Sequence, residues 1–226
     1  MNAIRHPKTI LANIIVSQAN HQHIVDFLWK ASRLSLAVLS FWAVFLQALY
    51  LIQLGRFELA GFLSFFTIQA NLFVIAVLLI ETFNGCGISS DRRASLRGAA
   101  VLYLAITGLV YAVLLSKLPI VKEIVHPVAD AFHHLIMPTW VLFDWVANPP
   151  SHRISIRRAL WWFVYPLAYL FVSLIRGALT GWYPYPFLDP ASPGGWFGIV
   201  AVSVAVLILG TIILLVIIRL QPRNRD

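Results

Sequence analysis

Residues 196–218 read WFGIVAVSVAVLILGTIILLVII, a stretch without a charged side chain. A helix of about 20 mostly apolar residues is long enough to cross the hydrocarbon core of a bilayer. Five mostly apolar stretches of comparable length precede it, at residues 34–54, 62–83, 98–118, 127–147 and 159–175. The sequence therefore predicts an all-α polytopic membrane protein, a bundle of six transmembrane helices.

The overall composition agrees with a membrane protein. Of the 226 residues, 60% are hydrophobic and 12% are charged, which is outside the range of a soluble domain. The formal net charge of +8 fits the Lys and Arg excess of cytoplasmic loops, so we expect no nucleic-acid partner. The single cysteine, Cys86, excludes an intramolecular disulfide.

The basic residues predict the orientation of the chain in the membrane. Six spans place both termini on one side, and most Lys and Arg residues fall in the segments of that side. Only Arg56, Lys117, Lys122 and Arg176 fall on the other side. Because Lys and Arg accumulate in cytoplasmic segments, we expect both termini in the cytoplasm.

This orientation divides the chain into three parts. Residues 1–33 form a cytoplasmic N-terminal segment, residues 34–218 the six-helix transmembrane domain, and residues 219–226 a cytoplasmic basic tail. The apolar side chains of residues 10–15 fit either a helix that lies on the membrane surface or an ordinary amphipathic tail.

The stretch 127–147 carries four ionisable residues, Asp130, His133, His134 and Asp144, inside an otherwise apolar segment. Ionisable groups in hydrocarbon are costly and mark functional sites by default. In the expected topology His133 lies about five residues, or roughly 7–8 Å, below the outer surface, whereas Asp144 lies about 16 Å deeper. Asp144 is therefore expected to be a structural acid of the inner half.

Thr67 lies at the same expected depth as His133, on the helix of residues 62–83. A hydroxyl beside an imidazole can act as a nucleophile with its base, and the corresponding chemistry is acyl transfer. Such a reaction also needs a donor for the oxyanion, for which Asn71, Gln69 and His134 are candidates.

Other polar residues converge on this outer layer. Asp130 belongs to it, and Arg176 ends the helix of residues 159–175. The following segment, GWYPYPFLDP at residues 181–190, is too apolar for a free aqueous loop, and it predicts a lid on the bundle that contributes Asp189.

Three segments together resemble the androgen-induced family of six-helix membrane hydrolases and its bacterial relatives. They are FFTIQANL at 65–72, HHLIMPTWVLFD at 133–144 and GWYPYPFLD at 181–189. The resemblance implies hydrolysis of fatty acid esters by a threonine matching Thr67 and a histidine, for which the spacing to Pro138 favours His133 over His134. It also implies a multi-pass protein of a bacterial plasma membrane, with membrane lipids as partners.

The chain departs from the animal members of this family at three positions. They have a glutamate in place of Asp144, and their threonine motif lacks Gln69 and Asn71. These differences indicate a bacterial branch, whose substrate need not be that of the animal enzymes.

Plainer interpretations remain beside this one. Thr67 also fits a helix-packing residue, Arg176 a side chain that reaches to the headgroups, and Glu81 a solvated helix end. His126, Asp130 and His133 have the spacing of a metal site, but His126 precedes Pro127 and falls outside the helix, so no metal or cofactor is expected. The alternative function is a non-catalytic membrane protein that binds or transports a lipid or small molecule. The oligomeric state stays open.

Overall fold

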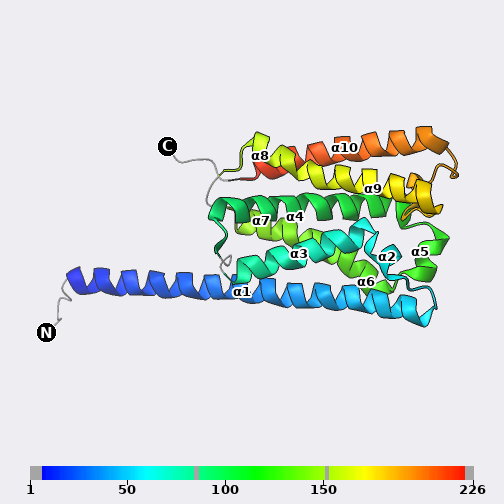
Figure 1. The fold of residues 1–226 in the computed structure, drawn as a ribbon. Helices are drawn as coiled ribbons and strands as arrows, with labels where there is room; N and C mark the ends of the chain where they lie inside the picture. The colour runs from blue at the N-terminus through cyan, green and yellow to red at the C-terminus, as the bar shows by residue number, and fades with distance from the viewer. Residues whose placement is uncertain (1–6, 84–86, 151–152, 222–226) are drawn as a thin grey trace.

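The computed structural model describes residues 7–83, 87–150 and 153–221. All regular secondary structure in this part of the chain is helical. The helices lie roughly side by side along one direction, and the first extends well beyond the others (Figure 1). The all-α prediction is confirmed for the described residues.

Four helical stretches are long and apolar enough to cross a membrane: Asn20–Gln53, Ser90–Leu115, Ile156–Thr180 and Gly195–Arg219. The first belongs to α1 (Pro7–Gln53), which runs through residue 33 without a break. At 1.5 Å per residue its 47 residues extend about 70 Å, more than twice the hydrocarbon thickness of a bilayer.

The other two expected spans have a different build. The helix α3 (Phe66–Thr82) has 17 residues and follows the short α2 (Leu59–Leu63). Residues 127–147 are helical throughout but consist of α6 (Pro127–Ala131), a π-helical turn (Phe132–Ile136) and α7 (Met137–Ala147). Four helices of spanning length are thus present in the described residues.

The centre of the bundle is α4 (Ser90–Val110), which continues as a π-helical turn (Tyr111–Leu115). It packs against α3, α7 and α10 (Gly195–Arg219). A small residue also permits close contact with the 3₁₀ turn Trp161–Phe163, since a Cβ atom at Gly98 would collide with the ring of Trp162. As a result α4 contributes the longest run of buried residues.

The outer faces of the bundle are apolar. On α9 (Val164–Thr180), Phe171 and Leu179 are exposed, and so is Phe197 at the start of α10. Water does not favour so many large exposed apolar side chains, whereas the hydrocarbon of a bilayer does. The described residues are therefore compatible with an integral membrane protein.

The segment between α9 and α10 folds back onto the bundle. Gly181, at φ +71°, ends α9 in the left-handed conformation that glycine adopts without strain. Tyr183 then packs against Gly177, where no Cβ would fit, and Tyr185 and Leu188 are buried. The expectation that this segment covers the bundle is confirmed.

The helices α5 (Pro119–Ile124) and α6 are hydrogen-bonded to α1 at the end of the bundle where the segment between α9 and α10 also lies. The amide of Gln47 donates to the carbonyl of Ile124 at 2.8 Å and accepts from the N–H of His126 at 2.9 Å. This link fixes where the helix carrying Asp130 and the two histidines begins.

Candidate active site

Two polar clusters lie at opposite ends of the bundle. The first, the threonine cluster, consists of Thr67, Tyr111, Asp130, His134 and Tyr185. The second, the arginine cluster, consists of Arg33, Glu81, Arg93, Arg97 and Asp144. The segment 127–147 contributes to both, through Asp130 and His134 to the first and through Asp144 to the second.

Thr67 is the second residue of α3. Residue Phe65 precedes the helix in an extended conformation, and no side chain caps the helix start. The first N–H groups of a helix have no partner within it, and that of Thr67 donates to the hydroxyl oxygen of Tyr185 at 3.3 Å. The Thr67 side chain thus lies at the positive end of the α3 dipole.

A continuous relay of hydrogen bonds starts at the Thr67 hydroxyl. Its Oγ1 lies 3.3 Å from Nε2 of His134, and Nδ1 of the same ring lies 2.8 Å from Oδ1 of Asp130. A carboxylate accepts the proton on Nδ1, so Nε2 is left as the acceptor that faces Thr67. The three side chains therefore follow the order hydroxyl, imidazole, carboxylate, which is the order that an activated nucleophile, its base and an orienting group require.

Two π-helical turns face one another at this relay. Tyr111 begins the turn after α4 and His134 lies in the turn after α6, and their rings stack with centroids 3.7 Å apart at an angle of 7°. The backbones also approach closely, because a Cβ on Gly108 would lie 2.9 Å from the carbonyl oxygen of His134. Such π-bulges occur frequently at functional sites.

Tyr111 also holds the carboxylate of the relay. Its hydroxyl donates to Oδ2 of Asp130 at 2.5 Å, while Oδ1 of Asp130 contacts His134. Both oxygens of Asp130 are thereby fixed, and the plane of the His134 ring is set by stacking. Tyr111 was not among the residues predicted from the sequence, because the sequence contains no signal for the π-turn that directs its side chain toward His134.

Tyr185 reaches the opposite side of Thr67 from the aromatic segment after α9. Its hydroxyl lies 3.4 Å from Oγ1 of Thr67, and its ring stacks on Phe187 and meets Phe65 edge to face. Burial raises the pKa of Tyr185, so its hydroxyl keeps its proton. The sequence pointed to the segment of residues 181–190 but not to Tyr185 in particular.

His133 does not make the predicted contact with Thr67. Its ring is only 2% exposed, lies edge-on to His134 with centroids 6.4 Å apart, and its Nε2 has no hydrogen-bond partner. Adjacent helical residues point about 100° apart, so only one of the two histidines can face the hydroxyl. The structure places His134 there, which corrects the expected pairing of Thr67 with His133.

The amide side chains named as oxyanion donors are engaged elsewhere. Asn71 is fully buried and donates to the carbonyl of Thr67 at 2.8 Å, while its oxygen lies 3.4 Å from the hydroxyl of Ser40. Gln69 donates to the carbonyl of Leu63 at 2.7 Å and accepts from Tyr165. Asn71 supports the backbone of Thr67, and Gln69 ties α3 to its neighbours.

Arg176 and Asp189 lie at the same end of the bundle but contact other groups. Arg176 stacks over Trp182 at 4.4 Å and lies 3.9 Å from the carboxylate of Glu58. The Oδ1 of Asp189 accepts from the N–H of Ala191 at 2.8 Å, which closes a local turn. Neither side chain is hydrogen-bonded to Thr67 or His134.

The described residues bring no three His, Cys, Asp or Glu side chains into a metal-binding arrangement. His126, one member of the spacing noted in the sequence, caps α6 instead, since its Nδ1 accepts from the N–H of Val128 at 3.2 Å.

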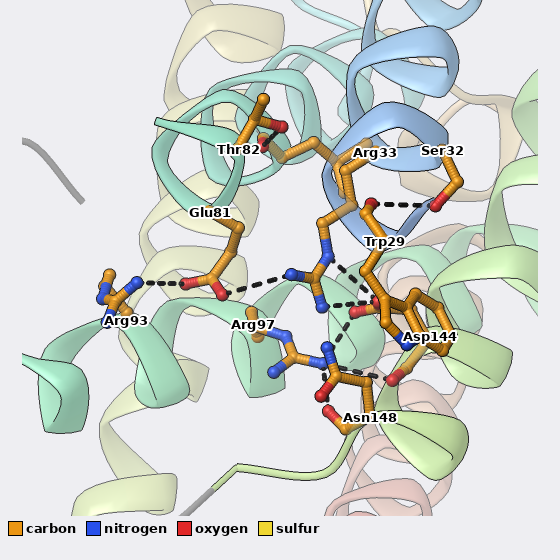
Figure 2. Close-up of polar contacts among 10 residues, drawn as sticks. Trp29, Ser32, Arg33, Glu81, Thr82, Arg93, Arg97, Asp144 and Asn148 are labelled. Carbon is orange, nitrogen blue, oxygen red and sulfur yellow. Dashed lines mark hydrogen bonds and ion pairs between the residues drawn. The ribbon is translucent and has the colours of Figure 1, made fainter. Parts of the chain in front are cut away.

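The arginine cluster joins four helices at the other end of the bundle (Figure 2). Asp144 of α7 accepts from Nη2 of Arg33 on α1 and from Nη2 of Arg97 on α4, each at 2.7 Å. All three side chains are less than a tenth exposed. Asp144 is thus a structural acid that links the helices, as the sequence suggested.

Glu81 at the end of α3 extends this cluster. Its carboxylate lies 3.7 Å from Arg33 and 3.9 Å from Arg93, and its side chain is only 10% exposed. The interpretation of Glu81 as a solvated helix end is therefore wrong. The reason is that α1 and α4 both place an arginine against this end of α3.

A cavity of about 120 Å³ opens on the side of Thr67. The lining is mostly apolar and comes from the start of α3, from α4, α9 and α10, and from the segment that carries Tyr185. Both Thr67 and Tyr185 line it, whereas His134 does not. The side chain of Thr67 therefore contacts His134 and also borders an apolar space.

No protein-family model, curated protein or solved structure matches this chain.

Proposed function

We propose that this protein is a membrane-embedded hydrolase of fatty acid esters, with Thr67 as the nucleophile, His134 as the general base and Asp130 as the group that orients it. The observation that carries the proposal is the relay Thr67–His134–Asp130, with contacts of 3.3 Å and 2.8 Å. Three side chains from two helices in this order match the geometry of an activated nucleophile.

In the first half of the reaction, Nε2 of His134 takes the proton of the Thr67 hydroxyl as Oγ1 attacks the ester carbonyl carbon. The resulting imidazolium is stabilised by Asp130, which stays ionised. His134 then gives the proton to the departing alcohol oxygen, and the acyl group remains on Thr67. In the second half a water molecule, deprotonated by His134, releases the fatty acid and restores the threonine hydroxyl.

The negative charge on the carbonyl oxygen needs donors close to Thr67. Tyr185 supplies a hydroxyl 3.4 Å from Oγ1, and its high pKa keeps the proton available for donation. The N–H of Thr67 at the start of α3 adds a second donor once Tyr185 turns toward substrate.

A lipid ester fits this site better than a water-soluble ester. The site lies in an all-helical bundle with apolar outer faces, and the space beside Thr67 is apolar. The resemblance to the androgen-induced membrane hydrolases points to the same substrate class, although its motif spacing favoured His133 and the contact with Thr67 is made by His134.

We also propose six membrane crossings with both termini in the cytoplasm, in a bacterial plasma membrane. The stretch 127–147 would supply about 31 Å of helix, and α3 about 25 Å, which α2 extends. The distribution of Lys and Arg supports the orientation.

Purified protein in liposomes, assayed against a panel of fatty acid esters, tests the activity. Thr67→Ala and His134→Ala are expected to lower kcat by about 10³-fold or more. His133→Leu, which keeps the volume of a buried side chain outside the relay, is expected to stay within about tenfold of wild type. Equal turnover by wild type and Thr67→Ala would refute the hydrolase proposal. Tight lipid binding without turnover would favour the non-catalytic alternative.

A further inference from the structure

The cavity beside Thr67 has one polar end. Thr67, Tyr169 and Tyr185 line it there, and Tyr169 is held in place because its hydroxyl donates to the carbonyl of Ser64 at 2.9 Å. Most of the remaining lining is aliphatic or aromatic. The hydroxyl of Thr107, one of the few polar groups farther in, is bonded to the carbonyl of Tyr103 at 2.8 Å. The space away from Thr67 thus suits a hydrocarbon chain.

Phe163 and Ile106 close the other end. Both line the cavity, and both pack against the bare backbone of Gly210. A Cβ on Gly210 would lie 2.9 Å from Cε1 of Phe163 and 3.2 Å from Cδ1 of Ile106. The ring of Phe163 is therefore wedged between α4 and α10, as a floor below the cavity.

The positions of the lining residues give the depth. From the 3₁₀ turn Trp161–Phe163 into α9 they run from Phe163 to Leu170, and on α10 from Val202 to Leu207. At 1.5 Å per residue these runs correspond to about 10 Å and 8 Å. An extended chain advances about 1.2 Å per bond, so roughly eight bonds fit between Thr67 and the floor.

The cavity opens sideways between α9 and α10. Leu167 of α9 is 50% exposed and Leu207 of α10 is 42% exposed, and both line the cavity. They lie on the apolar outer face of the bundle, so the opening faces lipid. A chain from the bilayer can enter there without crossing a polar barrier.

We propose that this cavity holds the acyl chain of the substrate, which enters from the bilayer between α9 and α10, and that Phe163 limits the chain to about eight to ten carbons. The inference rests on the proposed hydrolase function. It adds a substrate class, medium-chain acyl esters, and a residue that determines specificity.

A series of esters with one alcohol and acyl chains of 4 to 16 carbons tests the proposal by kcat/KM. We expect wild type to reach its maximum at about 8 to 10 carbons. For each variant, kcat/KM with the 16-carbon ester is divided by kcat/KM with the 8-carbon ester. Phe163→Ala is expected to raise this quotient by about tenfold or more, because a single methylene in an apolar pocket already changes kcat/KM by roughly tenfold.

A second variant covers the case in which Phe163→Ala does not fold. Val206→Phe fills the cavity from α10 and is expected to move the maximum toward shorter chains. Val204→Phe is the matched control, because Val204 lies on the same helix, is 50% exposed and does not line the cavity. A wild-type maximum at 16 carbons, or equal profiles for wild type, Val206→Phe and Val204→Phe, would overturn the proposal.

A measurement independent of turnover separates this inference from the hydrolase function. Decanoic acid with a photoreactive group at its methyl end, added to the protein in liposomes, is expected to label the peptide around Phe163 or that around Gly210. Labelling there without hydrolysis would leave the cavity assignment standing and remove only the catalytic function. Labelling confined to other peptides would refute the cavity assignment.

Discussion

At the scale of single residues, the proposed reaction requires an oxyanion donor, a role that the proposal gives to Tyr185. Tyr185→Phe keeps the buried ring and its stacking on Phe187 but removes the hydroxyl beside Thr67. Loss of one oxyanion donor lowers kcat by about 10²-fold to 10³-fold in enzymes of this kind. We expect that loss in steady-state kinetics with little change in KM, and a raised KM at unchanged kcat would contradict the assignment.

In the proposed reaction, Tyr111 is a positioning residue that acts through Asp130 and His134. Tyr111→Phe retains the stacked ring and loses the 2.5 Å hydrogen bond to Asp130, so kcat is expected to fall by about tenfold. Tyr111→Leu loses the stacking as well, and its kcat is expected to be lower still. The comparison is made by kcat at equal amounts of folded protein, and identical values for both variants and wild type would exclude the positioning role.

The sequence predicted part of this site. Counting residues from the expected outer surface placed Thr67 and the histidine pair at one depth, because the rise per residue of a helix is nearly constant. The choice between His133 and His134 depends on the π-turn at residues 132–136, which changes the direction of each side chain. Spacing to Pro138 carries no information on that turn, and so it favoured His133, the ring that does not contact Thr67.

At the scale of elements, the arginine cluster holds α1, α3, α4 and α7 together at the end away from Thr67. Asp144→Asn leaves the buried guanidinium of Arg97 without its carboxylate and that of Arg33 with only Glu81, at 3.7 Å. Removing one partner of a buried ion pair costs about 3 to 5 kcal/mol. For a chain of this size we expect the apparent Tm in detergent to fall by roughly 10 °C.

A surface pair of the same chemistry provides the control for that loss. Asp91 and Arg158 lie 3.3 Å apart, and both side chains are about half exposed. Asp91→Asn is expected to cost less than about 1 kcal/mol. Equal Tm values for Asp144→Asn and Asp91→Asn would show that the arginine cluster does not hold the helices.

Element boundaries were predicted less well than element types. The apolar run that begins at residue 34 predicted that a helix starts near that position. The helix instead begins at Pro7, because the change of composition at residue 34 is not accompanied by a change of backbone conformation. Glu81 looked solvated because the sequence cannot show that Arg33 and Arg93, from two other helices, meet the end of α3.

At the scale of the whole molecule, the membrane topology is open to direct test. In a background with Cys86→Ser, which removes the only cysteine of the sequence, single cysteines replace Gln22 on α1 and Ala191 between α9 and α10. A membrane-impermeant thiol reagent on intact cells is expected to label Ala191→Cys at once. Gln22→Cys is expected to react only after permeabilisation, and the reverse pattern would invert the proposed orientation.

The central claim is that Thr67 carries the acyl group during hydrolysis. A fluorophosphonate probe, which traps an activated hydroxyl covalently, followed by mass spectrometry of peptides, tests this most directly. We expect one modified residue, Thr67, with labelling lost in Thr67→Ala and His134→Ala and retained in His133→Leu. Labelling that persists in Thr67→Ala, or that depends on His133 and not on His134, would contradict it.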